Sequence, residues 1–264
     1  MSAQPQAVSR SLAESAIERI FKSGSAPLAL QRIVTPTKQG RWSEALLRPV
    51  LVGVDVAPQA VVECAARLNC ERALDRMVVL SVLQILQSDE HATCVSFNLC
   101  PGTTADTCLP EFVADALATR GIAPERLCVE FPETANLNAE SVIHAMHRWK
   151  GLGIRVAVDD LGIGSCSLRA VLAGAVDIVK MDAALLNDLV RSGSQECARR
   201  AAALAGCLTD MGLHVIFEGV ETTEHLRWLE RLPHTGFQGF AHSLPEAWKA
   251  RLTHPRIEPA AQSV

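Results

Sequence analysis

The chain has 264 residues, of which 48 % are hydrophobic and 20 % charged, with a formal net charge of −4. This length fits one large α/β barrel or two ordinary domains. The net negative charge argues against a DNA- or RNA-binding protein, which needs a basic surface. With no tyrosine and 4 % aromatic residues, the chain is also a poor candidate for stacking on nucleic-acid bases. A small nucleotide, held by an arginine and a metal ion, stays open as a ligand.

Residues 1–24 predict a leading helix, and they lack the apolar core of a signal peptide. No apolar stretch approaches the length of a membrane span. The nine cysteines are odd in number, several lie in apolar runs, and none forms a C-x-x-C pair. Reduced thiols are therefore expected, with little support for a structural zinc site. We expect a cytoplasmic protein without membrane contact.

Eight short β-type runs follow in chain order, separated by segments with helical spacing. The runs are 28–35, 42–48, 94–100, 126–131, 155–160, 178–182, 214–219 and 236–240. Helical spacing marks 59–68, 72–87, 139–150 and 195–211, with Asn138 as the expected N-cap of the third.

Strands that alternate with helices over about 240 residues predict a TIM-type (β/α)₈ barrel rather than an open sheet. We expect one barrel domain over residues 25–252, followed by a tail over residues 253–264 that contains two prolines.

Polar residues interrupt the apolar strands at or near their C-terminal ends, which is the rim where TIM barrels carry their chemistry. Glu44 lies in the second run and Gln238 in the eighth. The others are Asn98, Glu130, Asp159, Asp160, Lys180, Asp182 and Glu218. Two adjacent carboxylates at the end of a buried strand need a positive partner, either a metal ion or a basic side chain. A set of oxygen ligands suits Mg²⁺ or Mn²⁺, and Asp159 is placed to bridge two ions.

Seven short motifs in chain order resemble the EAL domain family of cyclic di-GMP phosphodiesterases, from about Leu28 to about Trp248. They are Glu44-Ala45-Leu46 continuing to Arg48, VSFNLC with Asn98, Glu130-Phe131-Pro132-Glu133, Asp159-Asp160-Leu161-Gly162, Lys180-Met181-Asp182, Glu218-Gly219-Val220-Glu221 and Gln238-Gly239-Phe240. The resemblance implies a modified TIM barrel whose first strand is antiparallel to the rest.

The resemblance also implies roles for individual residues. One metal ion would be held by Glu44, Asn98, Glu130 and Asp159, and a second by Asp159, Asp160 and Glu218. Lys180, Glu218 and Glu221 would be catalytic, with Lys180 polarising or deprotonating the attacking water. Substrate contacts would come from Gln31, Leu47, Arg48, Asp182, Gln238 and Pro245. Glu133, Gly162 and Gly164 would support the loop after the aspartate pair. A homodimer is expected by the same resemblance.

The supporting loop departs from the family pattern. Leu161, Ile163, Ser165 and Cys166 replace the usual Phe, small residue, Tyr and Ser, and Pro132 replaces a Thr. Three functions therefore stay open: a phosphodiesterase that uses two Mg²⁺ or Mn²⁺ ions to open cyclic di-GMP to pGpG; a non-catalytic regulator that binds cyclic di-GMP or a protein partner; and another two-metal hydrolase or lyase acting on a small phosphorylated substrate.

Overall fold

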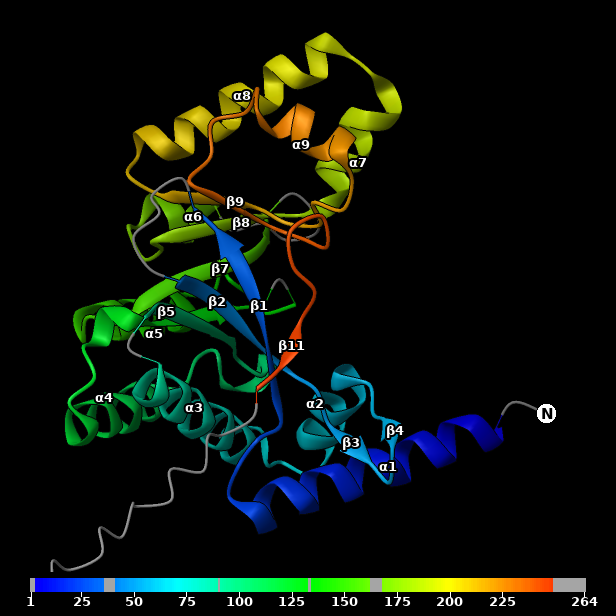
Figure 1. Cartoon of the computed structure of the whole chain (residues 1–264). Helices are drawn as coiled ribbons and strands as arrows, with labels where there is room; N and C mark the ends of the chain where they lie inside the picture. The colour runs from blue at the N-terminus through cyan, green and yellow to red at the C-terminus, as the bar shows by residue number, and fades with distance from the viewer. Residues whose placement is uncertain (1–2, 36–40, 90, 133, 162–167, 249–264) are drawn as a thin grey trace, which may run out of the picture.

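The computed structural model describes residues 3–35, 41–89, 91–132, 134–161 and 168–248, with side chains described from Leu12 onward except at Asp160 and Leu161. Eight strands form a closed barrel (Figure 1). They are β1 (Leu28–Val34), β2 (Arg41–Leu47), β5 (Ala92–Asn98), β6 (Leu127–Phe131), β7 (Arg155–Leu161), β8 (Ile178–Met181), β9 (His214–Phe217) and β10 (Gly236–Gln238).

The strands lie in chain order around the barrel, and β10 pairs with β1 to close it. β1 is antiparallel to both of its neighbours, β2 and β10, whereas the other strands are parallel to one another. The predicted barrel and its antiparallel first strand are confirmed. Every residue of β6 and β8 is buried, as expected for parallel strands that are covered on both faces.

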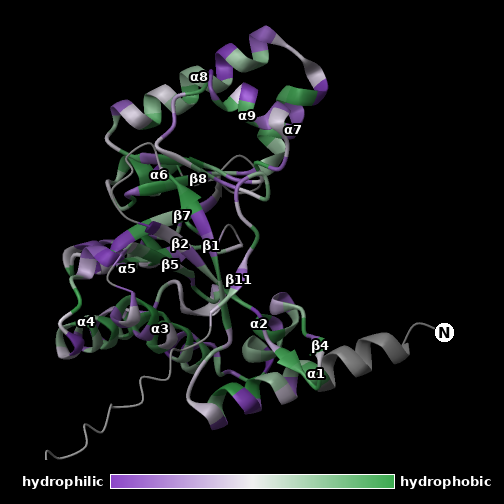
Figure 2. Ribbon diagram, viewed as in Figure 1, coloured by the Kyte–Doolittle hydropathy of each residue, from purple (hydrophilic) through white to green (hydrophobic). Residues whose placement is uncertain are grey.

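Nine helices are described: α1 (Ala3–Ser23), α2 (Pro58–Arg67), α3 (Glu71–Ser88), α4 (Cys108–Arg120), α5 (Glu140–Gly151), α6 (Leu168–Leu172), α7 (Ala183–Ser192), α8 (Gln195–Asp210) and α9 (Thr223–Leu229). They lie outside the strands, and each contributes buried apolar residues to the core. Hydrophobic and hydrophilic residues are interspersed along their coloured ribbons (Figure 2). α1 buries Ala13, Ala16, Ile17 and Ile20 on one face, against α2 and α3. The leading helix therefore shares the core of the barrel. No helix in the described part of the chain combines the length and apolarity needed to cross a membrane.

Some local features differ from the sequence expectations. The Asn138 cap is wrong: α5 begins at Glu140, with Ala139 at the cap position. The elements that were not predicted include the hairpin of β3 (Val50–Leu51) with β4 (Val54–Asp55), and β11 (Glu246–Ala247), which pairs with β1. The predicted tail at 253–264 lies outside the described residues.

An inner layer of apolar residues fills the barrel at one level. It consists of Ile33, Trp42, Cys94, Cys128, Ala157, Ile178 and Ile216. Because side chains alternate along a strand, the residue two positions nearer the rim points into the same interior. Those positions are Gln31, Glu44, Ser96, Glu130, Asp159, Lys180 and Glu218, so the next layer toward the rim is polar.

Candidate active site

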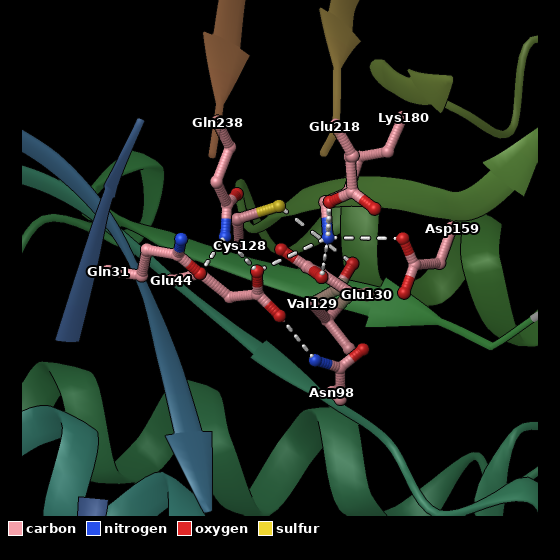
Figure 3. Close-up of polar contacts among 10 residues, drawn as sticks. All are labelled: Gln31, Glu44, Asn98, Cys128, Val129, Glu130, Asp159, Lys180, Glu218 and Gln238. Atoms are coloured by element: carbon pink, nitrogen blue, oxygen red, sulfur yellow. Dashed lines mark hydrogen bonds and ion pairs between the residues drawn. The ribbon is translucent and has the colours of Figure 1, made fainter. Parts of the chain in front are cut away.

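Lys180 lies at the centre of this polar layer and is 1 % exposed. Its Nζ is 2.6 Å from Glu218 Oε1, 2.7 Å from Glu130 Oε2, 3.1 Å from Asp159 Oδ1 and 3.4 Å from Glu44 Oε2 (Figure 3). These carboxylates come from β2, β6, β7 and the residue that follows β9. Strand pairing therefore brings together four acids that are up to 174 residues apart in the sequence (218 − 44).

A chain of amide groups holds Glu44. Asn98 Nδ2 donates to Glu44 Oε1 at 2.7 Å, and Gln238 Nε2 donates to Glu44 Oε2 at 2.7 Å. Gln238 Nε2 also lies 3.0 Å from Gln31 Oε1, and Gln31 Nε2 donates to the carbonyl of Ser243 at 3.2 Å. Strand register brings these residues together. Gln31 pairs with Glu44, Glu44 pairs with Ser96, two residues before Asn98, and Gln238 pairs with Ile33, two residues after Gln31. The Glu44 carboxylate is therefore fixed on both of its oxygens.

The charges of the cluster shift the pKa values of its members. Burial alone would lower the pKa of Lys180, but the charges of Glu130, Glu218, Glu44 and Asp159 outweigh burial and raise that pKa well above its usual value. Lys180 is therefore an ammonium group that donates hydrogen bonds. It can accept a proton from water only after losing its own.

Three of the acids respond differently. Burial opposes ionisation of Glu44, but the Lys180 charge and the hydrogen bonds from Gln238 and Asn98 outweigh it and lower the pKa of Glu44. Burial, followed by the negative charge of Glu44, raises the pKa of Glu130 well above its usual range. Burial also raises the pKa of Glu218, and its close contact with Lys180 only partly offsets this. One ammonium group does not neutralise all of these carboxylates.

The donor set fits a divalent cation. In the described part of the chain no group of three or more acidic, histidine or cysteine side chains has the arrangement of a formed metal centre; the oxygens converge on the Lys180 ammonium instead. However, among the described residues Gln238 Oε1 is buried without a hydrogen-bond donor, and buried Asp159 Oδ1 has only its ion pair with Lys180. Buried oxygen atoms that lack donors, beside carboxylates that exceed the local positive charge, are what Mg²⁺ or Mn²⁺ would satisfy.

Other predicted residues lie outside this cluster. Arg48 is exposed, donates to the carbonyl of Leu47 and lines a cavity of about 360 Å³ with Arg19 of α1. Asp182 caps α7 by accepting from the backbone N–H of Ala184. Leu47 and Pro245 are half-buried, and Glu221 is exposed. Glu133, Gly162 and Gly164, and the side chain of Asp160, lie outside what the structure describes.

The buried polar side chains at this rim that the sequence interpretation missed include His225, at the start of α9. Its ring contacts the segment that carries Glu218. The spacing Thr222-x-x-His225 was the available indication, because a polar side chain three residues after a helix cap can bond to the backbone that precedes the helix.

A second cavity, of about 450 Å³, lies at the opposite end of the barrel. Lys150, Arg155, Asp177 and His214 line it, and none of the residues around Lys180 does. The bottom end of a TIM barrel usually serves stability rather than chemistry. This cavity is therefore separate from the candidate active site.

The family model of the EAL domain matches residues 14–245. The chain is 26 % identical over 218 residues to the probable cyclic di-GMP phosphodiesterase PdeA of Escherichia coli (strain K12), which covers 79 % of this chain and 29 % of PdeA. It is 28 % identical over 149 residues to the blue light- and temperature-regulated antirepressor BluF of the same organism, covering 55 % of this chain and 36 % of BluF. The matched region is thus about a third or less of each of these relatives.

Among solved structures, the chain is similar to BlrP1 of Klebsiella pneumoniae in its calcium and cyclic di-GMP complex. The identity is 26 %, the TM-score is 0.73, and the match covers 84 % of this chain and 56 % of BlrP1.

Proposed function

The chain belongs to the EAL domain family, and from this premise we propose that it is a metal-dependent phosphodiesterase that hydrolyses cyclic di-GMP to linear pGpG. The observation that supports the proposal most strongly is the convergence of four carboxylates, among them the amide-held Glu44, on one buried lysine at the barrel rim. PdeA, similar over 79 % of this chain, is named a probable phosphodiesterase of this kind.

In the proposed reaction a water oxygen forms a bond to one phosphorus of cyclic di-GMP. The bond from that phosphorus to the 3′ oxygen breaks, and a proton from the water ends on the leaving oxygen. Two bound Mg²⁺ or Mn²⁺ ions would supply water activation and charge neutralisation. Glu44, Asn98, Glu130 and Asp159 would hold one ion, and Asp159, Asp160 and Glu218 the other.

The residues of the chain would contribute orientation and charge. Lys180, as an ammonium group, donates hydrogen bonds toward the attacking water and the phosphate oxygens, which carry negative charge throughout the reaction. Gln238 and Asn98 keep the Glu44 carboxylate in place. Arg48, exposed beside the rim, would bind the second phosphate of the substrate.

A product assay tests the proposal. Purified protein is mixed with cyclic di-GMP and Mn²⁺, and the nucleotides are separated. We expect pGpG from the wild type and from Glu63→Ala, which changes an exposed helix residue, and none from Glu44→Ala. Intact cyclic di-GMP in the wild-type reaction would rule the enzyme out.

A second candidate is a regulator that binds cyclic di-GMP or a protein without hydrolysing the nucleotide. It is favoured by Pro132 and by the altered residues after Asp160, and the chain is similar to BluF, which is named an antirepressor. Calorimetry with cyclic di-GMP separates the two, because binding with no pGpG formed supports the regulator. For both candidates we propose a cytoplasmic location and a homodimer. Light scattering of the purified protein gives its molar mass and so tests the dimer.

A further inference from the structure

His225 contacts two groups of one short segment. The residue is 5 % exposed, and its Nδ1 lies 3.1 Å from the backbone N of Glu221 and 3.1 Å from the carbonyl O of Gly219. Both groups belong to Glu218–Glu221, the connection between β9 and α9. One ring nitrogen therefore joins this segment to the first turn of the helix that follows it.

The contact extends a known helix cap. Thr222 caps α9, and its Oγ1 accepts from the backbone N–H of His225 at 3.1 Å. In a capping box the side chain three residues after the cap reaches back to the backbone N–H of the cap residue. Here His225 reaches one residue further, to Glu221. A single Nδ1 cannot serve both contacts: unprotonated it accepts from the Glu221 N–H, and protonated it donates to the Gly219 carbonyl. The role inferred for His225 requires the first form, the neutral ring with its proton on Nε2.

Neighbouring strands fix the rest of the segment. Glu218 N donates to Met181 O at 2.9 Å, and Val220 N donates to Gln238 O at 3.0 Å. Gly219 has φ +61°, and a Cβ there would lie 2.3 Å from the Cβ of Ala183. The segment is thus held by β8, by the start of α7 and by the end of β10, and His225 holds its C-terminal end.

We propose that His225 is a positioning residue that sets the orientation of the Glu218 carboxylate toward Lys180, through the backbone of Glu218–Glu221. Glu218 Oε1 is 2.6 Å from Lys180 Nζ, so a small shift of this backbone moves a charged group in the centre of the cluster. Without His225 the N–H of Glu221 loses its acceptor and the segment relaxes. The inference rests on the proposed phosphodiesterase activity.

Three variants test the proposal. His225→Leu keeps bulk but removes the acceptor, whereas His225→Gln places a side-chain oxygen at the same position, from which it can reach back to the segment before the cap. His214→Leu is the control, because His214 starts the same strand that Glu218 follows but lies at the opposite end of the barrel. We expect His225→Leu to lower kcat about 10- to 100-fold with little change in KM for cyclic di-GMP. His225→Gln and the control should keep the wild-type kcat. An unchanged kcat in His225→Leu, or no rescue by Gln, would overturn the proposal.

Mn²⁺ affinity, measured from the electron paramagnetic resonance of free Mn²⁺, gives a readout that needs no turnover. His225→Leu should bind Mn²⁺ about 10-fold more weakly than the wild type and His225→Gln. If the wild type does not hydrolyse cyclic di-GMP, the phosphodiesterase proposal fails on its own, and equal Mn²⁺ affinities in the three proteins would overturn the role of His225.

The wild-type protein also gives a direct spectroscopic check, which applies even if His225→Leu does not fold. Nitrogen NMR of the histidine rings should show His225 with an unprotonated Nδ1 and a protonated Nε2. A protonated Nδ1 would contradict the hydrogen bond from Glu221 and the proposal with it.

Discussion

At the rim of the barrel, Lys180 has four carboxylates within 3.4 Å and its side chain is 2 % exposed. At the opposite end, Lys150 pairs with one acid, Asp177, at 2.7 Å, and the two side chains are 27 % and 32 % exposed. Lys150 lies in the last turn of α5, and Asp177 directly precedes β8, the strand that carries Lys180. A half-exposed pair costs little to form. A buried cluster with excess negative charge costs desolvation energy, and active sites are where such arrangements occur.

The most severe test removes the buried ammonium group. Lys180→Met leaves the surrounding carboxylates without their cation, and breaking a buried pair by deleting one partner costs about 3–5 kcal/mol. We expect this loss in the free energy of unfolding, measured by urea denaturation without divalent metals near neutral pH. A loss below about 1 kcal/mol would mean that the carboxylates simply take up protons when the lysine is absent.

A second test concerns a buried acid on α3 that supports the loop after Asn98. Asp75 accepts hydrogen bonds from Cys100 N and Thr103 Oγ1, and burial raises its pKa to about 6. The folded pKa lies above the unfolded value of about 3.9, so the unfolded chain releases this proton first as the pH rises. The Asp75 contribution to stability is therefore fully present below about pH 4 and falls by about 3 kcal/mol as the pH rises past 6.

Asp75→Asn should remove this dependence. The Asn oxygen can accept from Cys100 N while its amide donates to Thr103 Oγ1, which still donates to the carbonyl of Cys100. Urea denaturation at pH 4, 5, 6 and 7 should show a flatter stability profile for the variant than for the wild type. Asp188→Asn, at an exposed position, is the control and should leave the profile as it is. Parallel profiles for Asp75→Asn and wild type would contradict the raised pKa.

Metal addition should stabilise the rim specifically. A ligand at 100 times its Kd raises the free energy of unfolding by about 2.7 kcal/mol if it binds only the folded state. We expect Mn²⁺ to produce this gain in wild type and EDTA to reverse it, seen as a change in Tm. Glu130→Gln should lose the gain, and Lys150→Met should keep it. Equal gains in wild type and Glu130→Gln would place Mn²⁺ elsewhere.

The smallest effect is expected at the opposite end. Lys150→Met removes the partner of Asp177, but the pair is partly exposed and Asp177 still accepts from Val156 N at 2.9 Å. The free energy of unfolding should fall by about 0–1 kcal/mol, measured by urea denaturation beside Lys180→Met. If Lys150→Met lowered the free energy of unfolding as much as Lys180→Met, the two lysines would contribute equally to stability, against this expectation.

The sequence by itself determined the barrel and most of the rim. The polar residues at or near the C-terminal ends of apolar strands identified Glu44, Glu130, Asp159, Lys180 and Glu218, because those ends meet at one rim of a TIM barrel. What these side chains touch was decided by strand register, which places Gln31 beside Glu44 and Asn98 beside Glu130.

Only the tertiary structure showed that Asp182 caps a helix, that α5 begins after Asn138, and that Lys180 is a proton donor surrounded by acids. His225 was hidden for the same reason. Its role depends on the backbone N–H of Glu221, in a segment that also bonds to β8 and β10 through two other N–H groups. These partners are distant in the sequence, so no local pattern reveals them.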